Sequence, residues 1–186
     1  MTVPFGEAAF CALNCGLPLR TLARAATPVT VPQSMNSQSH SASRIIIATP
    51  RAIFCAIVDP EVLVKWRAPV GMEAVLLSFD PRLGGGYKMV LRYKDGTGQG
   101  KTTADSDVVL AHFEALEAEE RIVEAITFEN AGPAFGGTMR LTTTMKPVTG
   151  GTRVTLLAEE VPAGISEADH VAGMEAVLKN LANLLE

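Results

Sequence analysis

The chain has 186 residues, of which 47% are apolar and 19% charged, a composition that indicates one globular domain with a real core and excludes a disordered chain. Its formal net charge is −4, with no dense cluster of Lys and Arg, so nucleic-acid binding, which needs a basic surface, is not expected. No apolar run approaches the length of a membrane span.

The first predicted unit, residues 1–40, is a disordered tail or an extension. Prolines break any long element there, and Val31–Ala42 is polar and Ser-rich. Arg20 and Arg24, with a single acidic residue in the segment, leave a transit peptide as the alternative. Met35 stands just before the first convincing strand, so we expect the native protein to begin at that residue.

The three cysteines Cys11, Cys15 and Cys55 are odd in number, and two of them lie in the N-terminal segment. This pattern fits a reducing cytosol better than a disulfide framework, so we expect a cytoplasmic protein. Neither a His nor a second Cys pair lies near Cys11 and Cys15. No metal and no cofactor is therefore expected.

The folded body is predicted to begin with a strand and two short helices. Arg44–Ala48 is a short β-branched run typical of a strand. Thr49 and Pro50 have the order of an N-cap and a first helical residue, which predicts a helix through Ile57. Asp59 ends this helix and caps a second one over 60–66.

Six further strands are predicted, joined by turns rich in Gly, Pro, Asp and Asn. They are Met72–Phe79, Tyr87–Lys94, His112–Ala118, Arg121–Glu129, Thr138–Lys146 and Thr152–Glu160. Apolar and polar residues alternate along the clearest three, which predicts an antiparallel sheet with one dry face. That face carries Tyr87, Met89, Leu91, Met139, Leu141, Val154 and Leu156. Glu114 and Glu124 interrupt the apolar rows of two other strands, so the pattern does not decide which face of these strands is buried.

A long amphipathic helix is predicted over Ser166–Glu186, with a capping-box-like start at Ser166 and Asp169. Its apolar residues recur at helical spacings of three and four: Val171, Met174, Leu178, Leu181 and Leu185. So wide an apolar face needs a sheet to cover it. We expect an α+β fold in which a curved antiparallel sheet of about seven strands wraps around this helix and leaves a cavity.

Five stretches carry a family resemblance: ATPRAIFCAIVDPEVLVKWRAP (48–69), FDPRLGGGYKM (79–89), ERIVEAITFE (120–129), GGTMRLTTTMKPVTGGTRVTLLAEEVPAGIS (136–166) and AGMEAVLKNLANLLE (172–186). Together they resemble the START-like (SRPBCC) superfamily and, within it, the activator of Hsp90 ATPase homologue (AHSA1-like) family. The resemblance implies a helix-grip domain over 43–186 and a link to the stress response. The domain that precedes this one in the co-chaperone has no counterpart here, so an Hsp90-type chaperone is not expected as a partner.

Ligand-binding residues are expected where the dry sheet face meets the helix, and Trp66 is added because the resemblance places it near the cavity mouth. The full set is Trp66, Tyr87, Met89, Leu91, Tyr93, Met139, Leu141, His170, Gly173, Met174 and Val177. Most have a structural alternative: a core anchor for Trp66, a sheet face with hydroxyls at the rim for Tyr87 and Tyr93, gap-filling for the methionines, close packing for Gly173 and an ordinary rim position for His170.

The leading interpretation is non-enzymatic binding of a small hydrophobic or amphipathic molecule between sheet and helix. The sequence is also compatible with a protein that forms a homodimer. No catalytic residue is predicted. One alternative is a cyclase- or dehydratase-like enzyme, for which Glu124, His112 and His170 are the candidate acids or bases. Another is a protein-binding module of co-chaperone type, which needs an exposed patch on the outer sheet face.

Overall fold

The computed structural model describes residues 38–94, 96 and 100–186. Its strands are β1 Gln38–Ile46, β2 Met72–Asp80, β3 Gly86–Tyr93, β4 Ser106–Glu117, β5 Arg121–Phe128, β6 Met139–Val148 and β7 Gly151–Val161. Its helices are α1 Pro50–Val58, α2 Pro60–Trp66, the 3-10 helix η1 Pro133–Phe135, and α3 Glu167–Leu185. Residues 1–37 of the predicted tail, with the expected start at Met35, lie outside the described residues.

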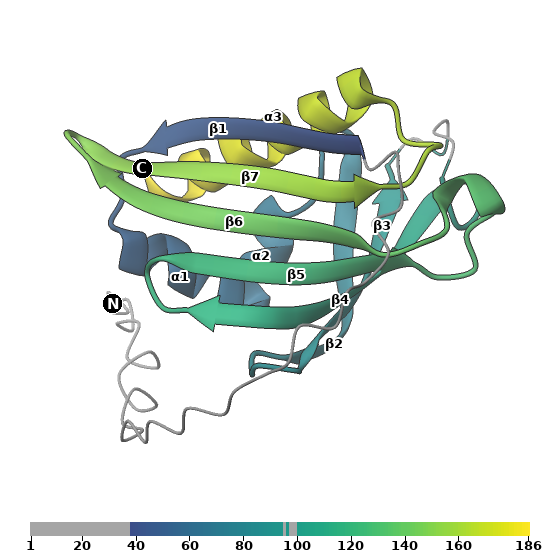
Figure 1. The fold of residues 1–186 in the computed structure, drawn as a ribbon, viewed down its shortest axis with the longest axis horizontal. Helices are drawn as coiled ribbons and strands as arrows, with labels where there is room; N and C mark the ends of the chain where they lie inside the picture. The colour runs from purple at the N-terminus through teal and green to yellow at the C-terminus, as the bar shows by residue number, and fades with distance from the viewer. Residues whose placement is uncertain (1–37, 95, 97–99) are drawn as a thin grey trace, which may run out of the picture. The chain divides into compact units, whose positions relative to one another are not determined.

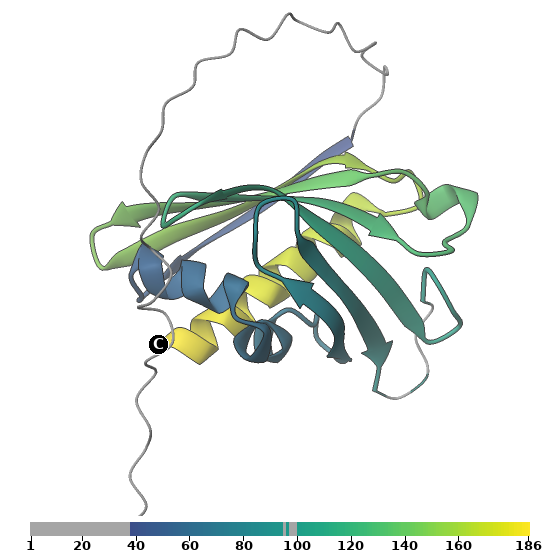
Figure 2. The ribbon, with the colours of Figure 1, turned by 90° about the horizontal axis from the view of Figure 1, so that it is seen from below.

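The strands form one antiparallel sheet in the order β1-β7-β6-β5-β4-β3-β2 (Figure 1). The sheet is curved, and α3 lies across its inner side together with α1 and α2 (Figure 2). The predicted helix-grip fold is therefore confirmed, including the two short helices after the first strand. Within the described residues, none of the helices combines the length and apolarity that a membrane crossing requires.

The predicted N-caps fix where the helices begin. Thr49 Oγ1 accepts a hydrogen bond of 3.2 Å from the Ala52 amide, and Asp59 Oδ1 accepts one of 2.9 Å from the Glu61 amide. Ser166 Oγ accepts from the Asp169 amide at 3.2 Å, as the capping box predicts. These bonds satisfy backbone donors that the first helical turns leave without intrahelical partners.

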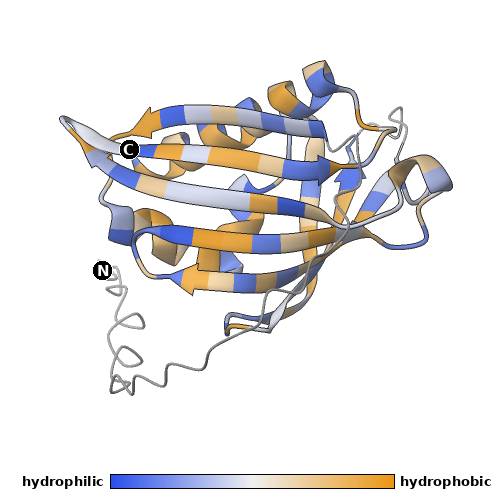
Figure 3. Cartoon of the chain, in the orientation of Figure 1, coloured by the Kyte–Doolittle hydropathy of each residue, from blue (hydrophilic) through white to orange (hydrophobic). Residues whose placement is uncertain are grey.

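Alternation along the strands places the core where the sequence pattern predicts it (Figure 3). In β6 the residues Met139, Leu141 and Met145 are buried, and their neighbours in the chain are more exposed. Val154 and Leu156 are buried in the same way in β7. The dry face of the sheet therefore packs toward α3, and the residues expected to meet the helix do so.

The first strand is longer than predicted, since it covers Gln38–Ile46 instead of 44–48. It pairs antiparallel with β7 from Gln38 to Ile46, with one irregularity in the register between Gln38 and His40. His40 and Ala42 are buried, whereas Ser41 and Ser43 between and after them are exposed. The Ser-rich segment therefore contains the start of a strand, in which buried His40 and Ala42 alternate with exposed serines, and residues 38–40 belong to the sheet.

Strand β4 also begins earlier than predicted, at Ser106 instead of His112. The added part contains Val109 and Ala111, which are buried, and Asp107, which is only 2% exposed. A charged residue at an inward position breaks the apolar alternation, and this is why the sequence pattern misses the start of the strand.

Candidate ligand cavity

A cavity of about 520 Å³ lies between α3 and the inner face of the sheet. Its walls come from β2 to β7, from α3 and from the loop that follows α2. Small-molecule sites typically have volumes of about 300–1,000 Å³. The predicted ligand residues that line the cavity are Tyr87, Met89, Leu91, Tyr93, Met139, Leu141, His170, Gly173, Met174 and Val177.

Trp66 is not among the residues that line this cavity. Its side chain is 1% exposed, and its Nε1 donates a 3.0 Å hydrogen bond to the carbonyl oxygen of Ala56. The expected position at the cavity mouth is therefore wrong. The indole is a core anchor between the two short helices, and the bond satisfies its N–H in the apolar interior.

Gly173 leaves part of the cavity open on the helix side. A Cβ atom added at this position would meet no heavy atom within 4 Å. Close packing against a strand, the structural alternative for this glycine, is therefore not the reason for it. The absent side chain instead adds to the space beside Met174, in a cavity that Met89 and Met139 line from the sheet.

A buried polar network closes one end of the cavity. Arg67, which follows the last residue of α2, donates from Nη2 to Glu124 Oε2 at 2.8 Å and to the Tyr87 hydroxyl at 3.0 Å. The Tyr87 hydroxyl in turn donates to Glu124 Oε1 at 2.7 Å. Glu124 is 0% exposed and the Arg67 side chain 10%. The three groups form a closed triangle in which both carboxylate oxygens are used.

The surroundings of the network fix its protonation. Burial raises the pKa of the Tyr87 hydroxyl well above its usual range; the positive charge of Arg67 opposes this effect and the negative charge of Glu124 adds to it. Burial by itself would lower the pKa of Arg67, but the attraction of Glu124 and Tyr87 outweighs it and the pKa is raised. At neutral pH the guanidinium is charged and the phenol stays protonated.

The position of Arg67 depends on α3. Asn180 in the helix donates from Nδ2 to the carbonyl oxygens of Ala68 at 2.9 Å and Trp66 at 3.4 Å. These two carbonyls flank Arg67 in the chain. The bonds tie the end of α2 to α3, so the guanidinium is held between the helix and the sheet.

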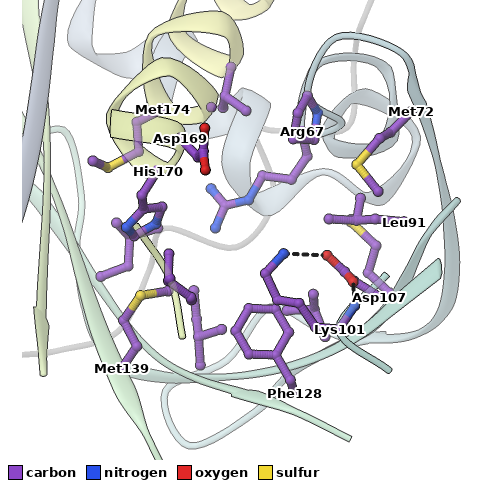
Figure 4. A pocket seen from close by; sticks show the side chains of 18 of the residues that line it. Arg67, Met72, Leu91, Lys101, Asp107, Phe128, Met139, Asp169, His170 and Met174 are labelled. Carbon is purple, nitrogen blue, oxygen red and sulfur yellow. Dashed lines mark hydrogen bonds and ion pairs between the residues drawn. The ribbon is translucent and has the colours of Figure 1, made fainter. Parts of the chain in front are cut away.

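A second ion pair stands on the wall formed by β4. Lys101 Nζ lies 2.6 Å from Asp107 Oδ2, and the Lys101 amide donates to the other oxygen of the same carboxylate (Figure 4). The ammonium also lies 5.1 Å from the centroid of the Phe128 ring, at a cation–π distance. Both charges are thus compensated within the wall.

His170 lines the cavity from the first turns of α3, and its Nδ1 lies 3.0 Å from Nδ1 of His40 in β1. One ring donates this hydrogen bond and the other accepts it, as two neutral imidazoles can. Burial lowers the pKa of His170 to about 4, and His40 and Lys101 contribute to the shift. The imidazole is therefore neutral at pH 7.

The three acid–base candidates are dispersed. His112 is exposed and does not line the cavity, so its expected role inside the cavity is wrong. Glu124 has both oxygens occupied by Tyr87 and Arg67, and it lies behind the cavity wall. Only His170 of the three contacts the cavity.

The sequence analysis did not single out the charged residues of the cavity, namely Arg67, Lys101, Asp107 and Asp169. Asp169, which the sequence analysis expected only as part of the capping box, reaches the cavity from the first turn of α3 (Figure 4). A signal for Arg67 existed in Glu124, because a lone carboxylate in an apolar strand row requires a buried cationic partner.

Residues 47–186 match the sequence profile of the family described as activator of Hsp90 ATPase homolog 1-like protein. The chain belongs to this family. A crystal structure of a Chromobacterium violaceum protein is 28% identical and has a TM-score of 0.71, over 80% of this chain and 96% of that one. The resemblance on which the sequence analysis relied is thereby confirmed.

More distant structures share the fold alone. A solution structure of an Arthrobacter aurescens protein is 18% identical, with a TM-score of 0.66 over 79% of this chain and 85% of that one. A crystal structure of a Rhodobacter sphaeroides protein is 19% identical, with a TM-score of 0.63 over 79% and 91%. No curated protein matches the chain.

Proposed function

We propose that this family member binds a small apolar or amphipathic molecule in the cavity and does not convert it. The observation that carries the proposal is the cavity of about 520 Å³ between α3 and the sheet. A core that had only to fold would be filled, because protein interiors are close-packed and empty space costs stability.

The composition of the wall supports an apolar ligand. Thioether and aliphatic side chains face each other across the space, and flexible methionines adapt to ligands of different shape. The proposed contacts are Tyr87, Met89, Leu91, Tyr93, Met139, Leu141, His170, Gly173, Met174 and Val177. Burial of apolar ligand surface contributes about 25 cal/mol per Å², part of which offsets the entropy lost on association.

The proposal extends to one ligand-binding domain in a cytoplasmic protein, and with the whole of β1 this domain covers residues 38–186. An odd number of cysteines in the whole chain supports a reducing compartment. Fractionation of cells that express the natural protein is expected to recover it with cytosolic markers. Recovery with an oxidising compartment would contradict this part of the proposal.

A matched pair of substitutions at Gly173 tests whether the cavity is the binding site. Gly173→Phe places a ring in the open space, whereas Gly173→Ala adds one methyl group that meets nothing within 4 Å. The probe is N-phenyl-1-naphthylamine, which is uncharged and fluoresces in apolar surroundings. We expect the wild type and Gly173→Ala to bind the probe with the same affinity. Gly173→Phe should bind it with an affinity lower by a factor of about ten or more.

Thermal unfolding followed by circular dichroism serves as the control, and both variants are expected to unfold cooperatively. Absence of probe binding by the wild type would contradict the proposal. Undiminished binding by a folded Gly173→Phe variant would show that the probe binds elsewhere, and it would contradict the proposal equally.

A further inference from the structure

We infer that the polar end of the bound molecule is an uncharged hydrogen-bond acceptor, such as a ketone, ester or amide carbonyl, held by the Arg67 guanidinium. This inference rests on the proposed function, because it assigns a ligand class to the same cavity. Two observations support it. The Arg67 guanidinium has N–H groups that make no hydrogen bond, and the charged side chains around it are already paired.

The guanidinium has donors to spare. It carries five N–H groups, and both of its hydrogen bonds, to Glu124 and Tyr87, start from Nη2. Within the part of the chain that the structure describes, Nε and Nη1 have no partner, and no fully buried side-chain nitrogen or oxygen lacks one. The Arg67 side chain lines the cavity and is 90% buried, and its guanidinium points into the cavity space (Figure 4). Because Nε and Nη1 are not fully buried, a ligand in this space can reach them.

Tyr87 cannot take this role, although it lines the cavity. Its hydroxyl donates to Glu124 and accepts from Arg67, so its proton and one lone pair are used. The closed triangle instead holds the guanidinium in one orientation before a ligand arrives. A donor fixed in advance loses little conformational entropy on binding.

The surrounding charges disfavour an anionic ligand. Glu124 already compensates Arg67, and Asp107 compensates Lys101. His170 is neutral at pH 7, while Asp169 adds a negative charge at the cavity edge. A ligand carboxylate at Arg67 would lie near Glu124 without an uncompensated cation to balance it, and burial of such a charge is costly. A carbonyl oxygen can accept the spare N–H groups without this cost.

Three naphthalenes with the same ring system and different end groups separate these possibilities. They are 2-acetylnaphthalene, which has a neutral acceptor, 2-naphthoate, which is an anion, and 2-ethylnaphthalene, which has no acceptor. Equilibrium dialysis at pH 7.5 measures the affinity of each for the full chain. We expect the ketone to bind about tenfold more tightly than the hydrocarbon, as a hydrogen bond to a charged donor allows, and the anion to bind more weakly than the ketone.

The double variant Arg67→Met/Glu124→Gln assigns the preference to Arg67. It removes both charges of the buried pair, so neither is left without its partner. The matched control, Arg140→Met/Glu114→Gln, removes a surface pair at 2.8 Å whose side chains are 45% and 42% exposed. The preference for ketone over hydrocarbon should vanish in the first variant and persist in the second.

The inference and the proposed function fail in different ways. Tighter binding of the anion, equal binding of the ketone and the hydrocarbon, or a preference that survives in Arg67→Met/Glu124→Gln would overturn the inference and leave the cavity as a binding site. Failure of all three compounds to bind, or their undiminished binding to Gly173→Phe, would overturn the proposed function and this inference with it.

Discussion

Nη2 of Arg67 lies 2.8 Å from Oε2 of Glu124, although 57 positions separate the two residues in the chain. The contact joins the end of α2 to the middle of β5. Both side chains are at least 90% buried. Loss of one member of this pair would therefore leave the other charge buried without its partner, next to the cavity.

Removal of one member of this pair should destabilise the protein strongly. Arg67→Ala leaves the Glu124 carboxylate buried without a cation, and the expected loss in unfolding free energy is about 3–5 kcal/mol. Arg67→Met/Glu124→Gln should lose much less, since no charge is stranded. Urea denaturation measures both, and equal losses in the two variants would contradict this account.

Gly173→Ala should stabilise the protein. The residue lies inside α3, where glycine is less favourable than alanine by about 0.5–1 kcal/mol, and the added methyl group meets no atom within 4 Å. Urea denaturation should show a gain of this size. A loss of unfolding free energy would contradict this account and would mean that the protein needs glycine at position 173 for a reason other than helix formation.

The titration of His170 predicts a loss of stability in acid. Its pKa is about 4 in the folded protein and about 6.5 in an unfolded chain. The unfolded state therefore binds a proton that the folded state excludes, so the stability is fully present above pH 6.5 and is lost as the pH falls toward 4. Urea denaturation at pH 7.5, 6.5, 5.5 and 4.5 measures this slope.

Substitution isolates the contribution of His170 from that of the carboxylates. His170→Gln should flatten the fall in unfolding free energy between pH 6.5 and 4.5, whereas His112→Gln, at an exposed position, should leave it unchanged. An identical slope in the wild type and His170→Gln would show that this imidazole is not responsible.

Trp66 should matter for stability and not for the ligand. Trp66→Phe removes the donor to the Ala56 carbonyl and leaves that oxygen buried, at an expected cost of about 1–3 kcal/mol. The affinity for N-phenyl-1-naphthylamine should not change. Because Trp66 is the only tryptophan and is 1% exposed, its emission maximum should lie at short wavelength in the wild type. A large loss of probe affinity in a stably folded variant would contradict this prediction and indicate that Trp66 contacts the ligand.

The parts of the fold that follow a repeated local pattern were predictable. Alternation identified the buried faces of β6 and β7, and the spacing of Met174, Leu178 and Leu181 identified the buried side of α3. Such patterns arise because the whole element turns one face to the core. They gave the cavity-lining residues Met139 and Leu141 for the same reason.

The charged groups of the cavity were not predictable in the same way. Arg67 finds Tyr87 and Glu124 at separations of 20 and 57 residues, so no local pattern connects them. Trp66 was misplaced because its position was taken from the family resemblance, and a shift of one residue at the end of a short helix exchanges a cavity position for a core position. Here Trp66 faces the core and the next residue, Arg67, faces the cavity.

The place of β1 at the edge of the sheet has a consequence for synthesis on the ribosome. Within the sheet β1 is hydrogen-bonded to β7 alone, and Ala48 just beyond it accepts a bond from Thr152, 104 positions later. Translation proceeds at roughly 5–20 residues per second, so β1 remains without its partner strand β7 for a time on the order of 5–20 s. During this time its backbone donors and acceptors are open to other chains, and its alternate serines keep the waiting strand hydrophilic.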